Sequence, residues 1–495
     1  MEIKDKKITI VGIGRSGVGA ANLLSELGAE VIVTDRKNGS ELKSFIGNIA
    51  PDVKTVLGRH PEDIFLSADM VIISPGVPLD ILPLSKAREK GIPIIGELEL
   101  AYLIIRSLAN SELSSLPLLK VQFLAITGTN GKSTTTSLTD FMLKKGGYRT
   151  ILGGNIGIAL TEEIFKIIKS SKSKVRNLVK NQDSETQTVN FQMDYIVTEV
   201  SSFQLESIQD FRPKGALILN ITPDHLDRYH RLEDYYDAKL RIFLNQGEGD
   251  FLIINADDKE LIKVVDEKLK MKSIKPEIFY FSREKEVEGV YFKNGKIYCN
   301  LSNPLIAARH SRLIDTEEIK IKGVHNLENA MAASAMALLA GCPIDAVRNS
   351  LKEFSGLEHR LEFVREIDGV KYFNDSKGTN IGAVIKSLES FEEPIILIAG
   401  GRDKAGDFSV LRNLVKEKVK AMVLIGEAAE KINKALGDLV ETFLAKNLEE
   451  AALISRNIST KGDIVLLSPG CASFDMFVDF EDRGRQFKKI VNGLK

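Results

Sequence analysis

Cysteine is scarce in this sequence, and long apolar runs are absent. Three cysteines, Cys299, Cys342 and Cys471, are spread over 495 residues, so we expect neither a disulfide framework nor a cysteine metal cluster, and a reducing compartment fits. No apolar run reaches the roughly 20 residues that a membrane-spanning helix needs. Met1–Lys7 alternates charges and leads directly into a strand, unlike a signal peptide. We therefore expect a cytoplasmic protein without membrane insertion.

An excess of charge of either sign is also lacking. Lys and Arg number 67 against 68 Asp and Glu, a formal net charge of −1, which argues against nonspecific binding of nucleic acid. The length suggests three domains of ordinary size, each able to bury its own core. We predict an α/β fold with a Rossmann-like N-terminal domain (1–97), a linker and a P-loop ATPase-like central domain (98–355), and a Rossmann-like C-terminal domain (356–495).

The sequence is organised around a glycine loop within Val121–Leu138, VQFLAITGTNGKSTTTSL. An apolar, β-branched run precedes the loop, and a helix-compatible run begins at Lys132. This order of strand, loop and helix is typical of phosphate sites, because backbone N–H groups and the helix N-terminus converge on the anion. Lys132 would reach the β- and γ-phosphates, and Ser133 or Thr134 would ligate Mg²⁺. The strict pattern G-x-x-x-x-G-K-[ST] fails at Ile126, which leaves a purely structural turn as the alternative.

A second strand–glycine–helix unit lies near the N-terminus. Ile8–Gly19 satisfies G-x-G-x-x-G, and the strand after the helix ends at Asp35, where a ribose or base hydroxyl could be bound. A later buried strand ends in Ser74-Pro75-Gly76, at the carboxyl edge of the same sheet. Many Rossmann-like units carry this fingerprint without binding NAD. Two glycine loops in separate domains nevertheless indicate two different nucleotide-bearing ligands.

Polar side chains follow two buried strands of the central domain. Glu199 ends the strand Tyr195–Val200, where a carboxylate is costly unless it holds a cation such as Mg²⁺. A helix-capping or salt-bridged glutamate is the alternative. Asn220–Arg228 follows the next strand and brings Asp, His and Arg side chains, among them His225, to the same edge. The histidines that we interpret as structural are His60, His230, His310 and His359.

Two segments of the central domain depart from a regular α/β pattern. Lys169–Asn190 is rich in Ser, Lys, Asn and Gln, which predicts a mobile surface excursion. Glu277–Arg312 mixes short strand-like pieces with turns, and Asn294-Gly295 is typical of a hairpin. A polar linker is predicted at Ala109–Pro117, and Tyr235–Phe243 reads as an amphipathic helix.

Eight stretches, in this order, resemble a Mur ligase, an ATP-dependent amide-forming enzyme of peptidoglycan precursor synthesis. They are TGTNGKST, TEVSSFQLE, NITPDHLDRY, AKLRIF, GVHNLENAMAA, GLEHR, NDSKGTN and LSPGCASFDMF. The last two resemble the member of that family that adds D-glutamate. The family's phosphate loop has the same short form, which removes the misfit with the strict pattern. The departures are Lys169–Asn190, an extended linker around Ile104–Leu119 and a glycine at 378.

The resemblance implies roles for individual residues. Those expected to bind the UDP sugar nucleotide are Gly14, Arg15, Ser16, Asp35, Arg36, Ser74, Gly76 and Asn155. Those expected to bind ATP are Gly128, Thr129, Asn130, Gly131, Lys132, Ser133, Thr134, Asn326, Asn329, Arg360 and Asp375. Two Mg²⁺ ions would be held by Ser133, Glu199, His225 and a carbamylated Lys239. D-Glutamate would be bound by Lys377, Thr379, Lys404, Ser473, Phe474 and Phe480, and the catalytic residues would be Lys132, His225, Lys239 and Lys377.

Two of these assignments depend on the resemblance alone. Asn326 and Asn329 lie at i and i+3 on the opening turn of an Ala-rich helix, where satisfying the helix N-terminus would otherwise be the preferred interpretation. Lys239 would otherwise be a solvated lysine on an amphipathic helix.

The resemblance also implies a reaction. A carboxylate is a poor acyl donor, so ATP phosphorylates the L-alanyl carboxylate of UDP-N-acetylmuramoyl-L-alanine. The amine of D-glutamate then attacks the acyl phosphate, and phosphate departs. Residues for one site come from all three domains, so we expect the third domain to close on the substrates. We also expect a monomer.

Other functions compete with this one. An NAD-dependent oxidoreductase would rest on the first glycine loop alone and leave the Lys132 loop unexplained. A noncatalytic nucleotide-binding regulator would need only Lys132 and Ser133, and it would leave His225 and Lys239 without a role. The nearer alternatives are a Mur ligase that adds a different amino acid and a folylpolyglutamate synthetase. The synthetase is disfavoured because the first domain is expected to bind UDP.

Overall fold

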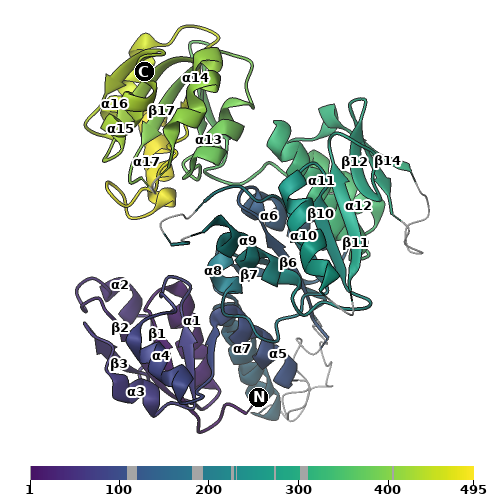
Figure 1. The fold of residues 1–495 in the computed structure, drawn as a ribbon, viewed down its shortest axis with the longest axis vertical. Coiled ribbons are helices and arrows are strands. Elements are labelled where there is room, and N and C mark those ends of the chain that lie inside the picture. The colour runs from purple at the N-terminus through teal and green to yellow at the C-terminus, as the bar shows by residue number, and fades with distance from the viewer. Residues whose placement is uncertain are drawn as a thin grey trace.

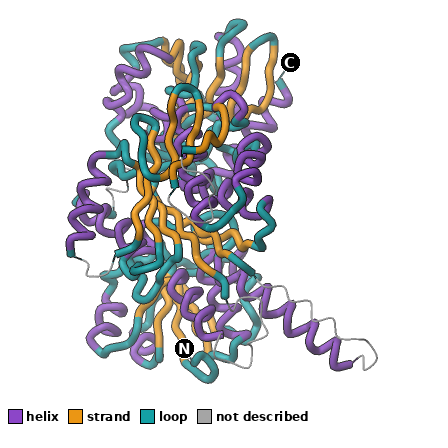
Figure 2. The backbone as a smooth tube through the Cα atoms, turned by 90° about the vertical axis from the view of Figure 1, so that its right-hand side faces the viewer, coloured by secondary structure: helices purple, strands orange, loops and turns teal. Residues whose placement is uncertain are grey.

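Three separate β-sheets follow one another along the long axis of the molecule in chain order (Figure 1 and Figure 2). The structure is a computed structural model that describes residues 2–108, 120–180, 193–224, 228–229, 231–271, 275–301, 310–403 and 406–494, and their side chains except those of 108 and 171–180. Each predicted domain contains one sheet, so the predicted α/β class is confirmed. The boundaries at residues 97 and 355 stay predictions.

The first sheet is wholly parallel, with the order β3-β2-β1-β4-β5. Apolar side chains of its strands are buried against α1 and α5 on one face and against α3 and α4 on the other, as expected of a covered parallel sheet. The strands are β1 Lys7–Val11, β2 Glu30–Asp35, β3 Lys54–Leu57, β4 Met70–Ile73 and β5 Ile94–Gly96. The helices are α1 Arg15–Glu26, α2 Lys43–Ile46, α3 Glu62–Leu66, α4 Leu82–Glu89 and α5 Glu97–Leu108.

The middle sheet has the order β14-β13-β12-β11-β10-β9-β6-β8-β7. Its strands run parallel from β7 to β12, and β13 and β14 continue it in antiparallel fashion. The strands are β6 Gln122–Thr127, β7 Thr150–Gly154, β8 Tyr195–Glu199, β9 Gly215–Ile218, β10 Phe251–Asn255, β11 Glu277–Ser282, β12 Gly289–Lys293, β13 Lys296–Asn300 and β14 Ser311–Asp315. The helices are α6 Lys132–Lys145, α7 Leu160–Lys180, α8 Ser202–Leu205, α9 Leu232–Leu240, α10 Lys259–Lys270, α11 Val324–Leu339 and α12 Ile344–Glu353.

The third sheet has the order β15-β16-β20-β17-β18-β19, and only β15, which pairs with β16, is antiparallel in the described part of this sheet. The strands are β15 Glu362–Ile367, β16 Val370–Asn374, β17 Ile395–Gly400, β18 Val419–Ile425, β19 Glu441–Leu444 and β20 Ile464–Leu467. The helices are α13 Ile381–Leu388, α14 Arg412–Lys418, α15 Ala429–Leu436, α16 Leu448–Ile458 and α17 Phe480–Gly493.

The first two sheets share one hydrophobic core. Helix α7 follows a strand of the middle sheet but packs against α1 of the first (Figure 1). Buried Leu23 and Leu24 of α1 belong to the same cluster as Leu160 and Ile164 of α7. The two clusters of the third sheet are drawn from residues 361–494. A domain with its own core can move as a unit relative to its neighbours.

The first part of the excursion predicted over Lys169–Asn190 is helical, because α7 continues to Lys180, and its mobility stays a prediction. Apolar residues at helical spacing, including buried Leu160 and Ile164, start this helix. The Lys, Arg and Leu that follow are good helix formers. Residues 181–190 lie outside the described part of the chain, as does the linker predicted at Ala109–Pro117.

The hairpin predicted at Asn294-Gly295 is confirmed. These residues join β12 to β13 with φ values of +49° and +73°, and two successive left-handed residues are typical of a type I′ turn. The helix predicted over Tyr235–Phe243 begins earlier and ends in a 3₁₀ turn, Arg241–Phe243. Within the described residues, no helix is long and apolar enough to cross a membrane.

Candidate active site

A glycine loop joins β6 to α6. Gly131 has a φ of +85°, and a Cβ there would lie 2.3 Å from Asn329 Oδ1, so this position requires glycine. The Oδ1 atom of Asn220 accepts from the backbone N–H groups of Thr129 and Asn130 at 3.0 and 2.9 Å and holds the loop. Among the described residues, no side chain caps α6. Its first N–H groups and its dipole are therefore available to an anion.

The predicted phosphate lysine lies against its own loop. Lys132 Nζ donates to the carbonyl oxygens of Gly128 and Thr129 at 2.9 and 2.8 Å. The ammonium group therefore lies beside the glycine loop. This placement fits a point charge that neutralises phosphate oxygens.

Glu199, at the end of β8, places a buried carboxylate beside the loop. Its exposure is 2%, and it accepts from Ser133 Oγ at 2.6 Å and from Asn155 Nδ2 at 2.8 Å. Both partners are side chains, which does not fit a helix cap. Burial raises the pKa of this carboxyl, but Lys377, Lys132 and the two hydrogen bonds outweigh burial and lower it overall. An ionised carboxylate is the kind of ligand that Mg²⁺ prefers.

Lys239 is buried, not solvated, with 2% exposure. Its Nζ donates to the carbonyl oxygen of Gly128 at 2.9 Å and lies 4.6 Å from the ring centre of Tyr235. Burial, followed by repulsion from Lys132, lowers the pKa of Lys239 well below its usual value, against the opposing charges of Asp224 and Glu199. Burial therefore shifts this group toward the neutral amine. The alternative of a solvated lysine is wrong.

The predicted metal ligand His225 lies outside the described residues, but the preceding residue does not. Asp224 Oδ2 accepts from Asn380 Nδ2 at 3.1 Å, and Asn380 caps α13 of the third sheet. The loop that carries His225 therefore contacts the third domain.

A cavity of about 520 Å³ lies between the middle and third sheets. Thr134 and Asn326 line it from the middle sheet's helices, and Arg360 lines it from the chain leading to β15. Thr134 Oγ1 and Arg360 Nε are buried without a hydrogen-bond partner among the described residues. A polar ligand in this cavity could pair with both groups. Three phenylalanines supply apolar walls, namely Phe363, Phe373 and Phe391.

The two asparagines of α11 share one face, as predicted. Asn329 Nδ2 donates to Asn326 Oδ1 at 3.3 Å, and Asn329 Oδ1 accepts from Thr135 Oγ1 at 3.2 Å. Asn326 reaches the cavity, whereas Asn329 lies against the glycine loop. The pair therefore links α11 to the phosphate loop and to the cavity.

The third domain places Lys377 near Glu199 and Lys132. Burial lowers the pKa of Lys377, with Arg360 and Lys132 acting in the same sense and Glu199 against them. Its Nζ lies 5.1 Å from the ring centre of Phe480. Charges from two domains thus meet at Glu199.

Asp375 makes its hydrogen bonds inside the third domain. Its Oδ2 accepts from Ser387 Oγ at 2.6 Å and from Ser468 Oγ at 2.8 Å, and its Oδ1 accepts from the N–H of Leu361 at 3.3 Å. Burial raises the pKa of this carboxyl despite Arg360 and the two hydroxyls. Its predicted contact with ATP stays a prediction.

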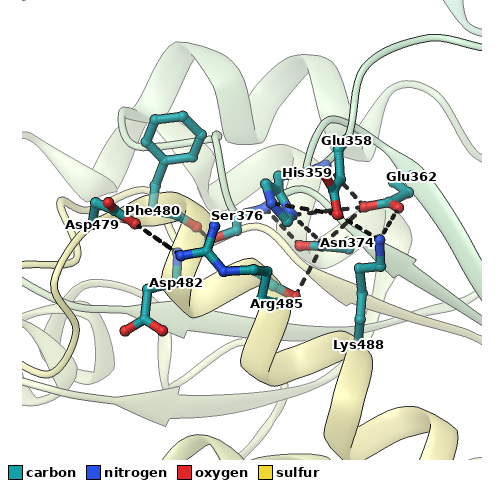
Figure 3. A network of polar contacts seen from close by, with 11 residues as sticks. Glu358, His359, Glu362, Asn374, Ser376, Asp479, Phe480, Asp482, Arg485 and Lys488 are labelled. Atoms are coloured by element: carbon teal, nitrogen blue, oxygen red, sulfur yellow. Dashed lines mark hydrogen bonds and ion pairs between the residues drawn. The ribbon is translucent and has the colours of Figure 1, made fainter. Parts of the chain in front are cut away.

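Arg360 is held between two residues with left-handed backbone, His359 at φ +65° and Leu361 at φ +42°. Figure 3 shows the polar network beside it, in which Asn374 Nδ2 contacts His359 Nδ1 at 2.9 Å. Glu358, His359 and Glu362 offer ligand atoms within 4.8 Å of one another. Lys488 Nζ, however, lies 2.8 and 2.6 Å from the two glutamates and supplies the positive charge there. These contacts agree with a structural His359.

Five of the residues predicted to bind D-glutamate come from segments that one buried arginine connects. Arg483 of α17 is 0% exposed. Its Nε donates to Ser376 Oγ at 2.9 Å, its Nη2 to Ser376 O at 2.8 Å and its Nη1 to Cys471 O at 3.3 Å. Ser376 precedes Lys377 and donates to Phe480 O at 2.8 Å. The five predicted residues that are described are Lys377, Thr379, Ser473, Phe474 and Phe480, and Lys404 lies outside the described part.

Arg483 is not among the residues predicted from the sequence, although the sequence contains a signal for it. Arg483, Phe487 and Val491 are buried at i, i+4 and i+8 of α17, so the arginine occupies the apolar stripe of an amphipathic helix. A charge at such a position needs buried partners.

Replacing Arg483 by alanine should lower the free energy of unfolding of the third domain by about 2–4 kcal/mol, because buried carbonyls lose their donors. Denaturant unfolding measures this. The control is Arg485→Ala on the same helix, where the arginine side chain is 59% exposed and little change is expected. Equal losses in the two variants would contradict the role of Arg483.

A second cavity, of about 550 Å³, lies at the carboxyl edge of the first sheet. It collects seven of the eight residues predicted for the sugar nucleotide, namely Gly14, Arg15, Ser16, Asp35, Arg36, Ser74 and Gly76. Asn155 lies beside Glu199 instead, so its contact with the sugar nucleotide stays a prediction. The cavity is also lined by residues that the sequence motifs did not predict, among them Lys37, Phe45, His60 and Pro78.

Three family models match most of the chain. The Mur ligase MurD-like N-terminal domain matches residues 6–96, the Mur ligase middle domain residues 126–337, and the Mur ligase glutamate ligase domain residues 359–471. The chain belongs to the Mur ligase family. It is an ATP-dependent, amide-forming ligase, and the resemblance inferred from its motifs is confirmed.

Two full-length relatives of this Mur ligase carry the name UDP-N-acetylmuramoylalanine--D-glutamate ligase. The relative from Geotalea daltonii is 44% identical over 497 residues, covering 100% of this chain and 99% of that protein. The relative from Clostridioides difficile is 41% identical over 503 residues, covering 100% of both.

Solved structures of other ligases share the fold. The UDP-N-acetylmuramate-alanine ligase of Thermotoga maritima matches with a TM-score of 0.56 at 19% identity, over 99% of this chain and 100% of that one. The MurF ligase of the same organism, in complex with ADP, matches with a TM-score of 0.58 at 15% identity, over 99% and 98%. The predicted three-domain architecture is confirmed.

Proposed function

We propose that this Mur ligase joins D-glutamate to UDP-N-acetylmuramoyl-L-alanine and converts ATP to ADP and phosphate. This step belongs to peptidoglycan precursor synthesis, and through it to cell shape and division. The observation that carries the proposal is buried Glu199, which accepts from Ser133 directly after the glycine loop and from Asn155, and whose pKa the charges of Lys377 and Lys132 lower against burial. The shared name of the full-length relatives supports the choice of substrates. Because these substrates are metabolites of the cytoplasm, we place the reaction there.

The two cavities suit two nucleotides. The cavity of the first sheet, with its glycine loop and seven predicted residues, would hold the UDP part of the sugar-nucleotide substrate. The cavity between the middle and third sheets would hold the base and ribose of ATP, with Thr134 Oγ1 and Arg360 Nε supplying hydrogen bonds that they lack among the described residues. The phosphates would then lie on the Lys132 loop.

The residues beside the loop fit Mg²⁺, because Ser133 and ionised Glu199 supply hard oxygen ligands next to a phosphate site. His225 and Lys239 would serve a second ion. Bound there, Mg²⁺ would neutralise charge on the transferring phosphoryl group. Lys132 would turn from the carbonyls of Gly128 and Thr129 to the β- and γ-phosphates, and Lys377 would stabilise the developing oxyanion from the third domain.

Lys239 would become an oxygen ligand by carbamylation. Its buried, neutral amine adds to CO₂, which forms an N–C bond and releases one proton. The product is an anion within reach of Lys132, whose charge now stabilises it instead of repelling it. Carbamylation therefore changes an unfavourable buried amine into a metal ligand.

We expect D-glutamate to be the preferred acceptor amino acid. Lys377 and Lys404, with the hydroxyls of Thr379 and Ser473, match the two carboxylates of a small dianion. L-Lysine and diaminopimelate carry a distal ammonium group, which these lysines would repel in a poorly hydrated site. ADP release, measured with UDP-N-acetylmuramoyl-L-alanine, Mg²⁺ and each amino acid, should be high with D-glutamate. It should be low with L-alanine, L-lysine and diaminopimelate.

The variant Lys404→Ala tests in the same assay whether Lys404 binds D-glutamate. It should raise the KM for D-glutamate by at least about tenfold through the loss of one charged hydrogen bond, with a much smaller change in the KM for ATP. Lys416→Ala, an exposed lysine of α14, is the matched control. Preference for a cationic amino acid over D-glutamate would overturn the assignment.

A further inference from the structure

The cavity of the first sheet contains an imidazole that no motif predicts. His60 follows β3 and lines this cavity together with the glycine loop, the end of β2 and the loop after β4. Its ring packs edge-on against Phe65, with 6.2 Å between ring centres. The structural interpretation of His60 is therefore incomplete, because the ring faces a ligand cavity as well as the core.

The hydrogen bonds of His60 determine which ring nitrogen carries the proton. Thr34 is fully buried, and its Oγ1 lies 2.8 Å from the carbonyl oxygen of Arg59 and 3.0 Å from His60 Nδ1. A carbonyl cannot donate, so the single hydroxyl proton of Thr34 goes to Arg59. His60 Nδ1 must then donate to Thr34 Oγ1, which leaves Nε2 of the neutral ring as an acceptor.

The neutral ring is favoured. Burial lowers the pKa of His60, the charge of Arg36 acts in the same sense, and Asp35 opposes them. Nε2 has no hydrogen-bond partner among the described residues. Asp35, another acceptor that lines this cavity, already accepts from the N–H groups of Ile13 and Lys37, one on each oxygen, at 2.7 and 2.9 Å. The imidazole is thus an unused acceptor in a nucleotide cavity.

We propose that His60 selects uracil among pyrimidine bases by accepting a hydrogen bond from its N3–H group through Nε2. Uracil carries a proton on N3, whereas cytosine presents a lone pair at N3, and two facing lone pairs repel. A site that hydrogen-bonds a substrate N–H rejects the analogue that lacks it, because a buried polar group is left unpaired. This inference rests on the proposed binding of a UDP sugar nucleotide by the first domain.

The wild-type protein tests the inference without any variant. The dissociation constants of UDP, CDP and N3-methyl-UDP are measured by titration calorimetry, with the ATP site filled by a non-hydrolysable ATP analogue. CDP and N3-methyl-UDP should each bind at least about tenfold more weakly than UDP, since each leaves Nε2 unpaired. Equal affinities for UDP and N3-methyl-UDP would overturn the inference.

Variants then assign the effect to His60. His60→Leu keeps a side chain of similar size without an acceptor. This variant should bind UDP about tenfold more weakly than the wild type does. Its dissociation constants for UDP and CDP should lie within about threefold of each other, because neither base then finds a hydrogen bond there. Thr34→Ser keeps the hydroxyl that orients the ring, and it should retain the wild-type preference. Thr34→Val keeps the shape but loses that hydroxyl, and the preference for UDP should shrink.

The outcomes separate this inference from the proposed function. If the wild type prefers UDP and His60→Leu keeps the same ratio of UDP to CDP affinity, His60 does not select the base, while binding of UDP stands. If the wild type binds no UDP, the proposed function fails together with the inference. Should His60→Leu not fold, the Thr34→Ser and Thr34→Val pair decides, because equal UDP-to-CDP ratios in the two would overturn the role of the ring.

Discussion

Replacing Lys132 by alanine should lower kcat/KM by at least about a hundredfold, the scale of other electrostatic stabilisers of transferring groups. Lys132 follows the glycine loop, and its Nζ contacts the carbonyl oxygens of Gly128 and Thr129. The side chain is half-buried and its ammonium group donates to backbone carbonyls of its own loop, so the protein should stay folded. The loss of kcat/KM therefore measures what the charge of Lys132 contributes at the phosphates. The coupled assay for ADP release measures it.

The control for Lys132 lies on the same helix. Lys144, near the C-terminal end of α6, has a 53% exposed side chain that pairs with Asp140 at 2.9 Å. Because Lys144 lies at the opposite end of α6 from the glycine loop, Lys144→Ala should leave kcat/KM within about twofold of wild type. If the Lys132→Ala variant shows near-normal turnover and unchanged thermal unfolding, the assignment of the glycine loop as a phosphate site is wrong.

Lys239→Ala should be nearly inactive and partly rescued by small added carboxylates such as acetate. The variant loses the proposed carbamate, which supplies anionic oxygen to a hard cation. An added carboxylate can occupy the same place and restore part of that charge. Turnover with and without acetate, at constant ionic strength, measures the effect. Mass spectrometry of the intact wild-type protein under mild conditions should also show the added mass of CO₂.

Two variants separate the carbamate from packing. Lys239→Arg keeps a long cation that cannot form this carbamate, so it should be as inactive as the alanine variant and show less rescue because the site stays filled. Lys268→Ala removes the partner of Asp237, a surface pair near α9 at 3.0 Å, and should retain activity. Full activity of Lys239→Ala without any additive would refute the carbamate.

Local patterns in the sequence were enough to locate the loops of the candidate site. Lys132 and Ser133 begin α6 directly after a glycine loop, the arrangement that a strand-to-helix phosphate turn requires. Glu199 ends an apolar run, which is typical of a buried parallel strand. The same reasoning located the hairpin at Asn294-Gly295. Each of these features depends on residues that are neighbours along the chain, which is the range over which sequence patterns operate.

Extended polar segments were less predictable. Residues 169–180 have a loop-like composition, yet α7 continues through them. Helix formation is cooperative once a helix has nucleated on buried residues such as Leu160 and Ile164. Composition alone does not record where that nucleus lies.

The sequence by itself determined the three α/β units, their order, the two glycine loops and membership of the Mur ligase family. Only the tertiary structure decided what the isolated side chains do. Lys239 reads as a solvated helix lysine until α9 packs it under the phosphate loop. His60 and Arg483 acquire roles only through Thr34, Ser376 and other partners far along the chain. Burial and hydrogen bonding of a polar group depend on such distant segments, and these contacts set its protonation and its chemistry.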